Sequence, residues 1–195
     1  MTKPTLTLLF ILCSAISIKT FAQIEKGTSL ISLSGAYTKQ KSNQSTNPSS
    51  YNLDVSGIRM LSQHFGLGFG IGLNGTKGPY LDPFVPTSQI VTLKTYNFTI
   101  GPIARYYFMP SKTISPFLSS QVGVYTGQID NNGNVYKSDG LKVGYDFAVG
   151  LAFLLNKNVA FETALHYKRT NSINTTGGTN YWVLGFGFQV FLPKK

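Results

Sequence analysis

The chain has 195 residues and a formal net charge of +10, with 12% charged and 42% hydrophobic residues. This length fits one domain, and the mean hydropathy of +0.02 excludes a bundle of membrane-spanning helices, each of which needs about 20 consecutive apolar residues. The charged share is about half that of an ordinary soluble protein, and 20 Gly, 11 Tyr and 14 Phe accompany it. This composition favours a β-rich chain with an apolar exterior.

The first 22 residues are predicted to be a secretory signal peptide. Lys3 supplies a positive charge, and the apolar run of residues 6–18 that follows it is too short to span a membrane as a helix. Cleavage is expected after Ala22, so residues 23–195 would form the mature domain.

The mature chain is expected to work without a cofactor, a metal or nucleic acid. The net charge of +10, less the two charges of Lys3 and Lys19, leaves +8, which in an exported protein suits anionic lipid head groups better than nucleic acid. The only cysteine, Cys13, lies in the signal segment, so no disulfide or cysteine-based site is available. The two histidines, His64 and His166, are too far apart to form a metal motif.

Eight segments in which apolar residues alternate with small or polar ones predict eight strands. They are residues 28–37, 51–59, 65–75, 95–108, 116–126, 141–154, 159–168 and 181–192. Long polar connections (38–50, 74–91, 127–140 and 170–180) alternate with short ones (60–64, 109–115 and 155–158). This alternation is typical of a membrane barrel with long loops at one end and short turns at the other. The expected fold is all-β, an eight-stranded antiparallel up-and-down transmembrane β-barrel.

The segment FGLGFGIGL (65–73) indicates which face of the barrel lies inside. Its four glycines alternate with bulky apolar residues, and their spacing does not match the glycine-rich loops that bind phosphate. An eight-stranded barrel has little room inside, so we expect the small face to line the lumen and the bulky face to contact lipid. In the alternative, a soluble lipocalin-like carrier, the two faces are exchanged.

The bulky face supplies a predicted lipid-facing set and two aromatic girdles. The lipid-facing set is Phe69, Ile71, Phe98, Phe147, Val149, Leu151, Leu165, Leu184, Phe186 and Phe188. The girdle at the periplasmic end, where the turns are short, is predicted to contain Phe65, Phe108, Phe117, Phe161 and Phe191. The girdle at the outer end is predicted to contain Tyr37, Tyr51, Tyr96 and Trp182.

Three stretches carry a resemblance to a known family, namely GPIARYYF (101–108), GLAFLLNKNVAFETALHY (150–167) and YWVLGFGFQVFL (181–192). With them, the mature chain resembles the small outer-membrane β-barrel proteins of the OmpA/OmpX type, most of all those of Bacteroidota-type bacteria. The resemblance implies a barrel in the cell outer membrane, with outer-membrane lipid and the barrel assembly machinery as partners. The chain departs from the family pattern at its end, where four residues follow the aromatic Phe191.

The inward face carries seven titratable side chains that are expected to brace the lumen as a charge network. They are Asp54, Arg105, Lys142, Asp146, Glu162, His166 and Lys168. Buried charges are stable only when they are paired. Counting from the turn at 155–158 places Asp146 opposite Lys168 and places Glu162 at the depth of Arg105. In the alternative, these charges exchange partners and open a gate.

The predicted role is structural or is an interaction at the cell surface, without enzymatic activity or open conduction. A narrow pore for small solutes or ions is the first alternative, although Tyr107 and the charged side chains would obstruct it. A lipid A-modifying enzyme is the second, by a distant resemblance to lipid A deacylase barrels, with His166, Ser172 and Glu162 as its candidates. A surface ligand would bind at loops 38–50 and 127–140.

Overall fold

The computed structural model describes residues 24–39, 49–81, 90–131, 134–137, 142–172 and 178–193. The predicted signal peptide lies outside these residues, as do the central parts of the four long connections. Within the described ranges no helix is long and apolar enough to cross a membrane.

The described residues form nine β-strands. They are β1 (Ser29–Lys39), β2 (Ser49–Met60), β3 (Phe65–Leu81), β4 (Ile90–Tyr107), β5 (Ile114–Asn131), β6 (Asn134–Lys137), β7 (Lys142–Leu154), β8 (Val159–Ser172) and β9 (Gly178–Leu192). Each of the eight predicted strands is present, and β3, β4 and β5 extend farthest beyond their predicted bounds. The short β6 lies in the segment predicted as a loop and pairs with the end of β5. Gly78, Pro79 and Lys94 interrupt the alternation of the sequence in these segments, although backbone pairing continues there.

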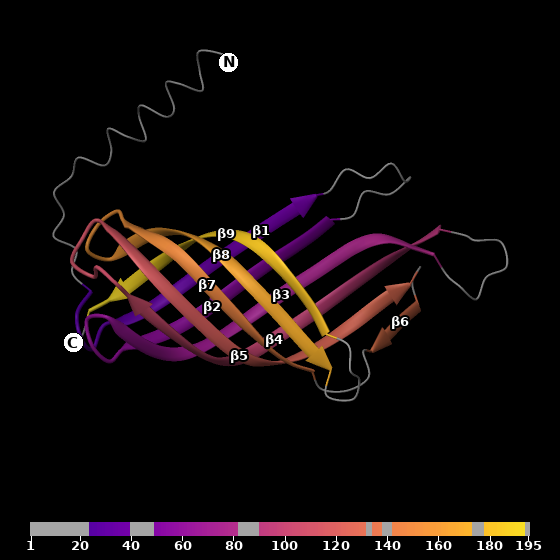
Figure 1. Ribbon diagram of the computed structural model, residues 1–195, viewed down its shortest axis with the longest axis horizontal. Coiled ribbons are helices and arrows are strands. Elements are labelled where there is room, and N and C mark those ends of the chain that lie inside the picture. The colour runs from indigo at the N-terminus through magenta and orange to yellow at the C-terminus, as the bar shows by residue number, and fades with distance from the viewer. Residues whose placement is uncertain are drawn as a thin grey trace, which may run out of the picture.

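Eight of the strands close into a barrel, which confirms the predicted fold. The sheet has the order β4-β3-β2-β1-β9-β8-β7-β5-β6, and the additional pairing of β4 with β5 closes it. Each ladder of the described barrel is antiparallel, and the short turns and the end of β9 lie at one end of the barrel (Figure 1). Closure pairs the backbone groups that an open sheet would leave at its edges.

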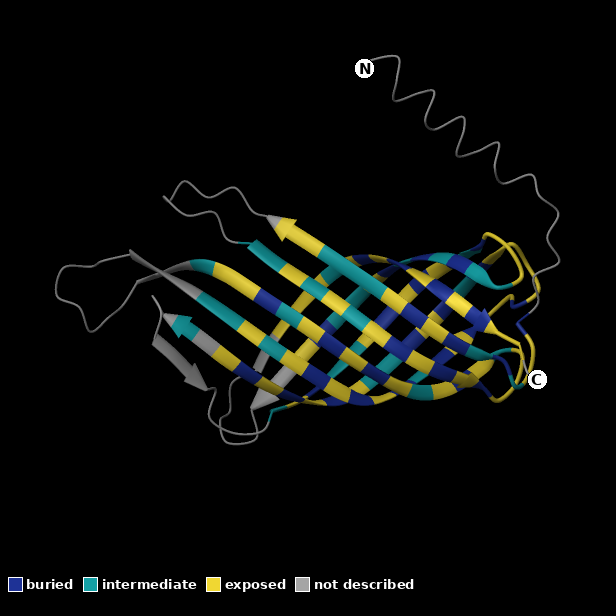
Figure 2. Cartoon of the chain, turned by 180° about the vertical axis from the view of Figure 1, so that it is seen from behind, coloured by how far each residue is buried: buried dark blue, intermediate teal, exposed yellow. Residues whose placement is uncertain are grey.

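The two faces of the barrel wall alternate along every strand. Exposed and buried residues follow one another as bands around the barrel (Figure 2). All ten residues of the predicted lipid-facing set are exposed on the outer face, from 37% for Phe98 to 67% for Phe69. The outer face therefore carries an apolar band. An exposed apolar surface of this kind is typical of a protein face that contacts lipid rather than water.

The end of the lumen beside the short turns is filled by a plug of apolar side chains. The plug comprises Ile24, Leu30, Ile58, Met60, Tyr107, Phe117, Leu154 and Phe191, none more than 4% exposed. This corrects the predicted periplasmic girdle, since Phe117 and Phe191 lie inside the barrel rather than on its outer face. Strict alternation from Gln189, which is also buried, would have placed Phe191 inside.

The glycines of β3 make room for the lumen side chains of other strands. A Cβ at Gly70 would lie 2.9 Å from the side-chain amide of Gln121 on β5, and that amide donates a hydrogen bond of 3.1 Å to the Gly70 carbonyl. At Gly68, a Cβ would collide with the carbonyl oxygen of Gly57 on β2. The glycine-rich inner face is thus required by the close approach of neighbouring strands and side chains in a narrow barrel.

We expect Gly68→Ala to lower the free energy of unfolding by about 1–3 kcal/mol, because backbone atoms must shift to admit the methyl group. The matched control is Gly57→Ala, since a Cβ at Gly57 meets nothing within 4 Å, and its effect should stay within about 0.5 kcal/mol. Denaturant unfolding in lipid vesicles, followed by the fluorescence of the single tryptophan, measures both. Equal effects of the two substitutions would contradict the steric argument.

Candidate functional site

A lower polar cluster crosses the lumen directly above the apolar plug. Arg105 on β4 forms an ion pair of 3.0 Å with Glu162 on β8, and the two side chains are 6% and 4% exposed. Ser32 on β1 donates a hydrogen bond of 2.7 Å to the same carboxylate. The Tyr107 hydroxyl donates to Gln189 on β9 at 2.7 Å, and the Gln189 amide donates to Glu162. Four strands are therefore joined through one carboxylate.

The Arg105 guanidinium is held by an aromatic ring as well as by its carboxylate. Its central carbon lies 4.5 Å from the centre of the Phe117 ring. Arg105 Nε is buried without a hydrogen-bond partner among the described atoms, so the ring face supplies part of the stabilisation that this side would otherwise lack. Phe117, which belongs to the plug, thus connects the plug to the lower cluster.

An upper polar cluster lies nearer the outer end. Lys168 Nζ on β8 contacts Asp54 on β2 at 2.9 Å and Asp146 on β7 at 3.3 Å, and it donates to the Asn52 side chain at 3.2 Å. His166 Nδ1 lies 3.1 Å from both carboxylate oxygens of Asp146. The lysine is thus shared by two carboxylates, which offsets the free energy required to bury its charge.

The two clusters contain six of the seven residues predicted as a lumen network. A cavity of about 30 Å³ lies between them, lined by members of both, including Arg105, Asp54 and His166. The seventh residue, Lys142, lies apart from both clusters and lines a larger cavity at the outer end. Lys142 is the first residue of β7, four residues before Asp146. It therefore lies at the outer mouth of the barrel rather than in its interior.

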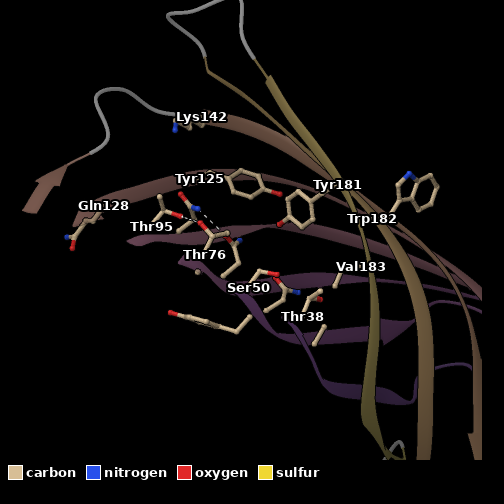
Figure 3. A pocket seen from close by; sticks show the side chains of 16 residues that line it. Thr38, Ser50, Thr76, Thr95, Tyr125, Gln128, Lys142, Tyr181, Trp182 and Val183 are labelled. Atoms are coloured by element: carbon tan, nitrogen blue, oxygen red, sulfur yellow. Dashed lines mark hydrogen bonds between the residues drawn. The ribbon is translucent and has the colours of Figure 1, made fainter. Parts of the chain in front are cut away.

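The outer end of the lumen is an open cavity of about 560 Å³. The inward-facing part of its described lining combines hydroxyl and amide side chains with two tyrosine rings and one cation: Thr38, Ser50, Asn52, Asn74, Thr76, Thr95, Asn97, Tyr125, Tyr181 and Lys142 (Figure 3). Tyr51, Gln128 and Trp182 border the cavity from outward-facing positions of their strands. The Thr76 and Thr95 hydroxyls are 2.6 Å apart, and Asn97 donates to Asn74 at 3.1 Å. The cavity is therefore polar and uncharged apart from Lys142.

The three residues considered for an enzymatic site are not brought together. His166 faces the lumen and is bound to Asp146, whereas Glu162 belongs to the lower cluster with Arg105. Ser172 lies six residues beyond His166 on β8, which is about 20 Å along a strand. Its side chain is outside the described part of the structure. Among the described residues no group of three His, Cys, Asp or Glu side chains could hold a metal.

Several members of the clusters were not predicted as site residues. Ser32, Asn52 and Gln189 are neutral side chains on the inner faces of their strands, and they supply hydrogen bonds to the charged groups. Alternation alone identifies them as inward-facing, but their partners depend on the stagger between strands that are distant in the sequence.

A closed barrel with an apolar outer face and a polar, charged interior defines the class of transmembrane β-barrels. A family model for the outer membrane protein beta-barrel domain matches residues 8–192. The chain therefore belongs to this family and is located in the cell outer membrane, where the apolar band of the barrel lies in lipid. No curated protein matches the chain in sequence.

Solved structures share the fold at low sequence identity. Neisserial surface protein A (NspA) aligns with 18% identity and a TM-score of 0.57 over 84% of this chain and 96% of that one. The outer membrane protein OprG from Pseudomonas aeruginosa aligns with 14% identity and a TM-score of 0.55 over 86% of this chain and 97% of that one. At these identities the similarity concerns the fold.

We expect Glu162→Ala to lower the free energy of unfolding by about 3–5 kcal/mol, because it leaves the Arg105 charge buried without its partner. The matched control is Lys94→Ala, which removes an ion pair with Asp130 whose lysine side chain is 44% exposed and should change stability by about 0.2–1 kcal/mol. The same unfolding assay compares the two. Similar small losses would show that the lower cluster does not brace the barrel.

Proposed function

We propose that this outer-membrane barrel is neither an enzyme nor an open channel, and that it serves the envelope structurally or through an interaction at its outer end. The observation that carries the proposal is the filling of the lumen at successive levels. The apolar plug closes the end beside the short turns, and the lower and upper clusters cross the barrel above it. The open polar cavity is confined to the outer end.

A narrow pore is less well supported than a closed barrel. Tyr107 is fully buried and Phe117 is 1% exposed, so the plug closes the path even if the ion pairs above it exchange partners. The cavity between the clusters, about 30 Å³, is about the volume of one water molecule. Water or ions would have to displace both packed side chains and paired charges to cross.

In the part of the chain that the structure describes, no set of groups is assembled to support an enzymatic role. Nucleophilic catalysis requires the nucleophile and its base within hydrogen-bond reach, and His166 is instead directed at Asp146 inside the lumen. A lipid-modifying site must also be reached from the membrane, whereas His166 and Asp146 side chains are only 13% and 12% exposed.

The outer end is the part of the barrel that suits an interaction. The cavity there presents hydroxyl, amide and aromatic groups, and Thr38, Ser50 and Gln128, which belong to the segments predicted as loops 38–50 and 127–140, border it. We include outer-membrane lipid and the barrel assembly machinery among the proposed partners, and a surface ligand at this end.

Planar bilayer recordings test the closed lumen. We expect the protein to give no unitary current steps, and we expect the double variant Arg105→Ala/Glu162→Ala to be equally silent, because the apolar plug remains. Steady conductance of the unmodified barrel would overturn the proposal. Conductance of the double variant alone would show that the ion pair, rather than the plug, is the barrier.

Incubation of the purified barrel with radiolabelled lipid A or phospholipid tests the non-enzymatic role. No release of fatty acid is expected, and His166→Ala should behave as the unmodified protein does. Release that depends on His166 would contradict the proposal.

A further inference from the structure

The wall of the barrel is not paired over its whole height at the seam between β1 and β9. Their ladder runs from Ser29–Leu192 to Gly35–Phe186 and ends there. Beyond it, β1 continues to Lys39 and remains paired with β2, while β9 extends back to Gly178 and remains paired with β8. Both strands thus diverge toward the outer end.

This seam differs from the other ladders of the described barrel. Each of them continues until at least one of its two strands ends, as the β1–β2 ladder does at Lys39–Ser49 and the β7–β8 ladder at Lys142–Ser172. At the β1–β9 seam, both strands continue past the last pair. We name the unpaired part, between residues 36–39 and 178–185, the lateral slot.

The lateral slot lies between the outer cavity and the apolar band. Ala36 and Thr38 on one side of the slot, and Tyr181 and Val183 on the other, line the cavity. On the outer face, the slot is flanked by Tyr37, Trp182 and Leu184, which are 69%, 64% and 54% exposed. In Figure 3, Trp182 is directed away from the polar group that surrounds the cavity. A molecule in the slot would therefore meet polar groups inside and apolar groups outside.

The cavity has the chemistry of a sugar-binding site. Hydroxyl and amide side chains both donate and accept hydrogen bonds, as the hydroxyl groups of a sugar do. Tyr125 and Tyr181 add ring faces with polar ends (Figure 3). The described lining contains no carboxylate, and its one cation, Lys142, disfavours a positively charged head group. The volume of about 560 Å³ lies within the range of small-molecule sites, about 300–1,000 Å³.

The floor of the cavity limits how far a head group can enter. Asn52 is shared by the cavity lining and the upper cluster, where Lys168 is held by Asp54 and Asp146. A head group therefore stops above these ion pairs. An attached apolar chain therefore cannot continue down the lumen, and the lateral slot is the place in the described wall through which it would reach lipid directly.

We propose that the outer cavity binds the sugar head group of a glycolipid from the outer leaflet, and that its apolar chain passes between β1 and β9 through the lateral slot. This deepens the surface interaction proposed above by naming its ligand class and its route of access. The proposed binding requires no passage of the lipid through the lumen. A conductance measurement therefore tests the closed barrel independently of glycolipid binding.

The test closes the lateral slot with a disulfide. Residues 38 and 183 would be partners if the β1–β9 ladder continued three pairs past its last pair, Gly35–Phe186. A disulfide holds the two Cα atoms about 4.4–6.8 Å apart, so its formation requires the two diverging strand ends to come together and closes the slot. The double variant Thr38→Cys/Val183→Cys is made with Cys13→Ser, so that it contains no other cysteine. The reduced form of the same variant shows that the barrel folds.

The matched control forms a disulfide at the same cavity without closing the slot. Thr38 is already paired with Ser50 in the β1–β2 ladder, and both residues line the cavity. Thr38→Cys/Ser50→Cys therefore alters the lining to a similar extent and leaves the β1–β9 seam open.

The probe is a glucosyl diacylglycerol with brominated acyl chains, added to phosphatidylcholine nanodiscs that contain the barrel. Bromine quenches Trp182, which is the only tryptophan of the chain and flanks the slot. We expect saturable quenching at least twofold above that by brominated phosphatidylcholine at the same mole fraction. Oxidation of Thr38→Cys/Val183→Cys should abolish this excess and reduction should restore it, while oxidised Thr38→Cys/Ser50→Cys should retain it.

Two results would overturn the proposal. Equal quenching by both brominated lipids would show that the sugar head group is not recognised. Excess quenching that persists when the slot is closed would show that the glycolipid binds elsewhere on the lipid-facing wall. Neither result bears on the proposal that the lumen is closed, because bilayer conductance tests that proposal on the same protein.

Discussion

The pairing of backbone hydrogen-bonding groups is the constraint on which the rest of this structure depends. In hydrocarbon no water is present to satisfy an exposed N–H or C=O group, so the sheet must close on itself. Closure with eight strands produces a narrow lumen. The glycines of β3, the inward position of Gln121 and the close contact of β2 with β3 all follow from that narrowness.

A narrow lumen also determines how charge can be kept inside it. Below the outer cavity the lumen is too small for bulk water, and each charged side chain there must therefore find its partners on other strands. The Glu162 carboxylate accepts hydrogen bonds from three side chains, and the Lys168 ammonium contacts two carboxylates and one side-chain amide. The ends of the lumen differ because the plug is apolar whereas the outer cavity is polar.

The barrel and the orientation of its faces could be predicted from the sequence, because period-two alternation is a local property that residues 65–73 and 141–154 display plainly. The opposition of Asp146 and Lys168 could be counted from a short turn. The plug was predicted wrongly because aromatic residues such as Phe117 suit either a girdle or a core, although alternation from Gln189 would have directed Phe191 inward. The end of the β1–β9 ladder, and with it the lateral slot, was also inaccessible, because it depends on the stagger of strands from opposite ends of the chain.

The β1–β9 ladder has a further consequence for how the barrel forms. Every other ladder joins strands that are near in the sequence, so it can form as a hairpin with a small loss of chain entropy. The β1–β9 ladder instead joins the first strand to the last, and its seven residue pairs convert an open sheet into a cylinder. Its formation is thus the non-local, slow event in assembly. A barrel whose final seam is short should open first at this seam, which makes the junction of its two terminal strands the part of the wall with the lowest local stability.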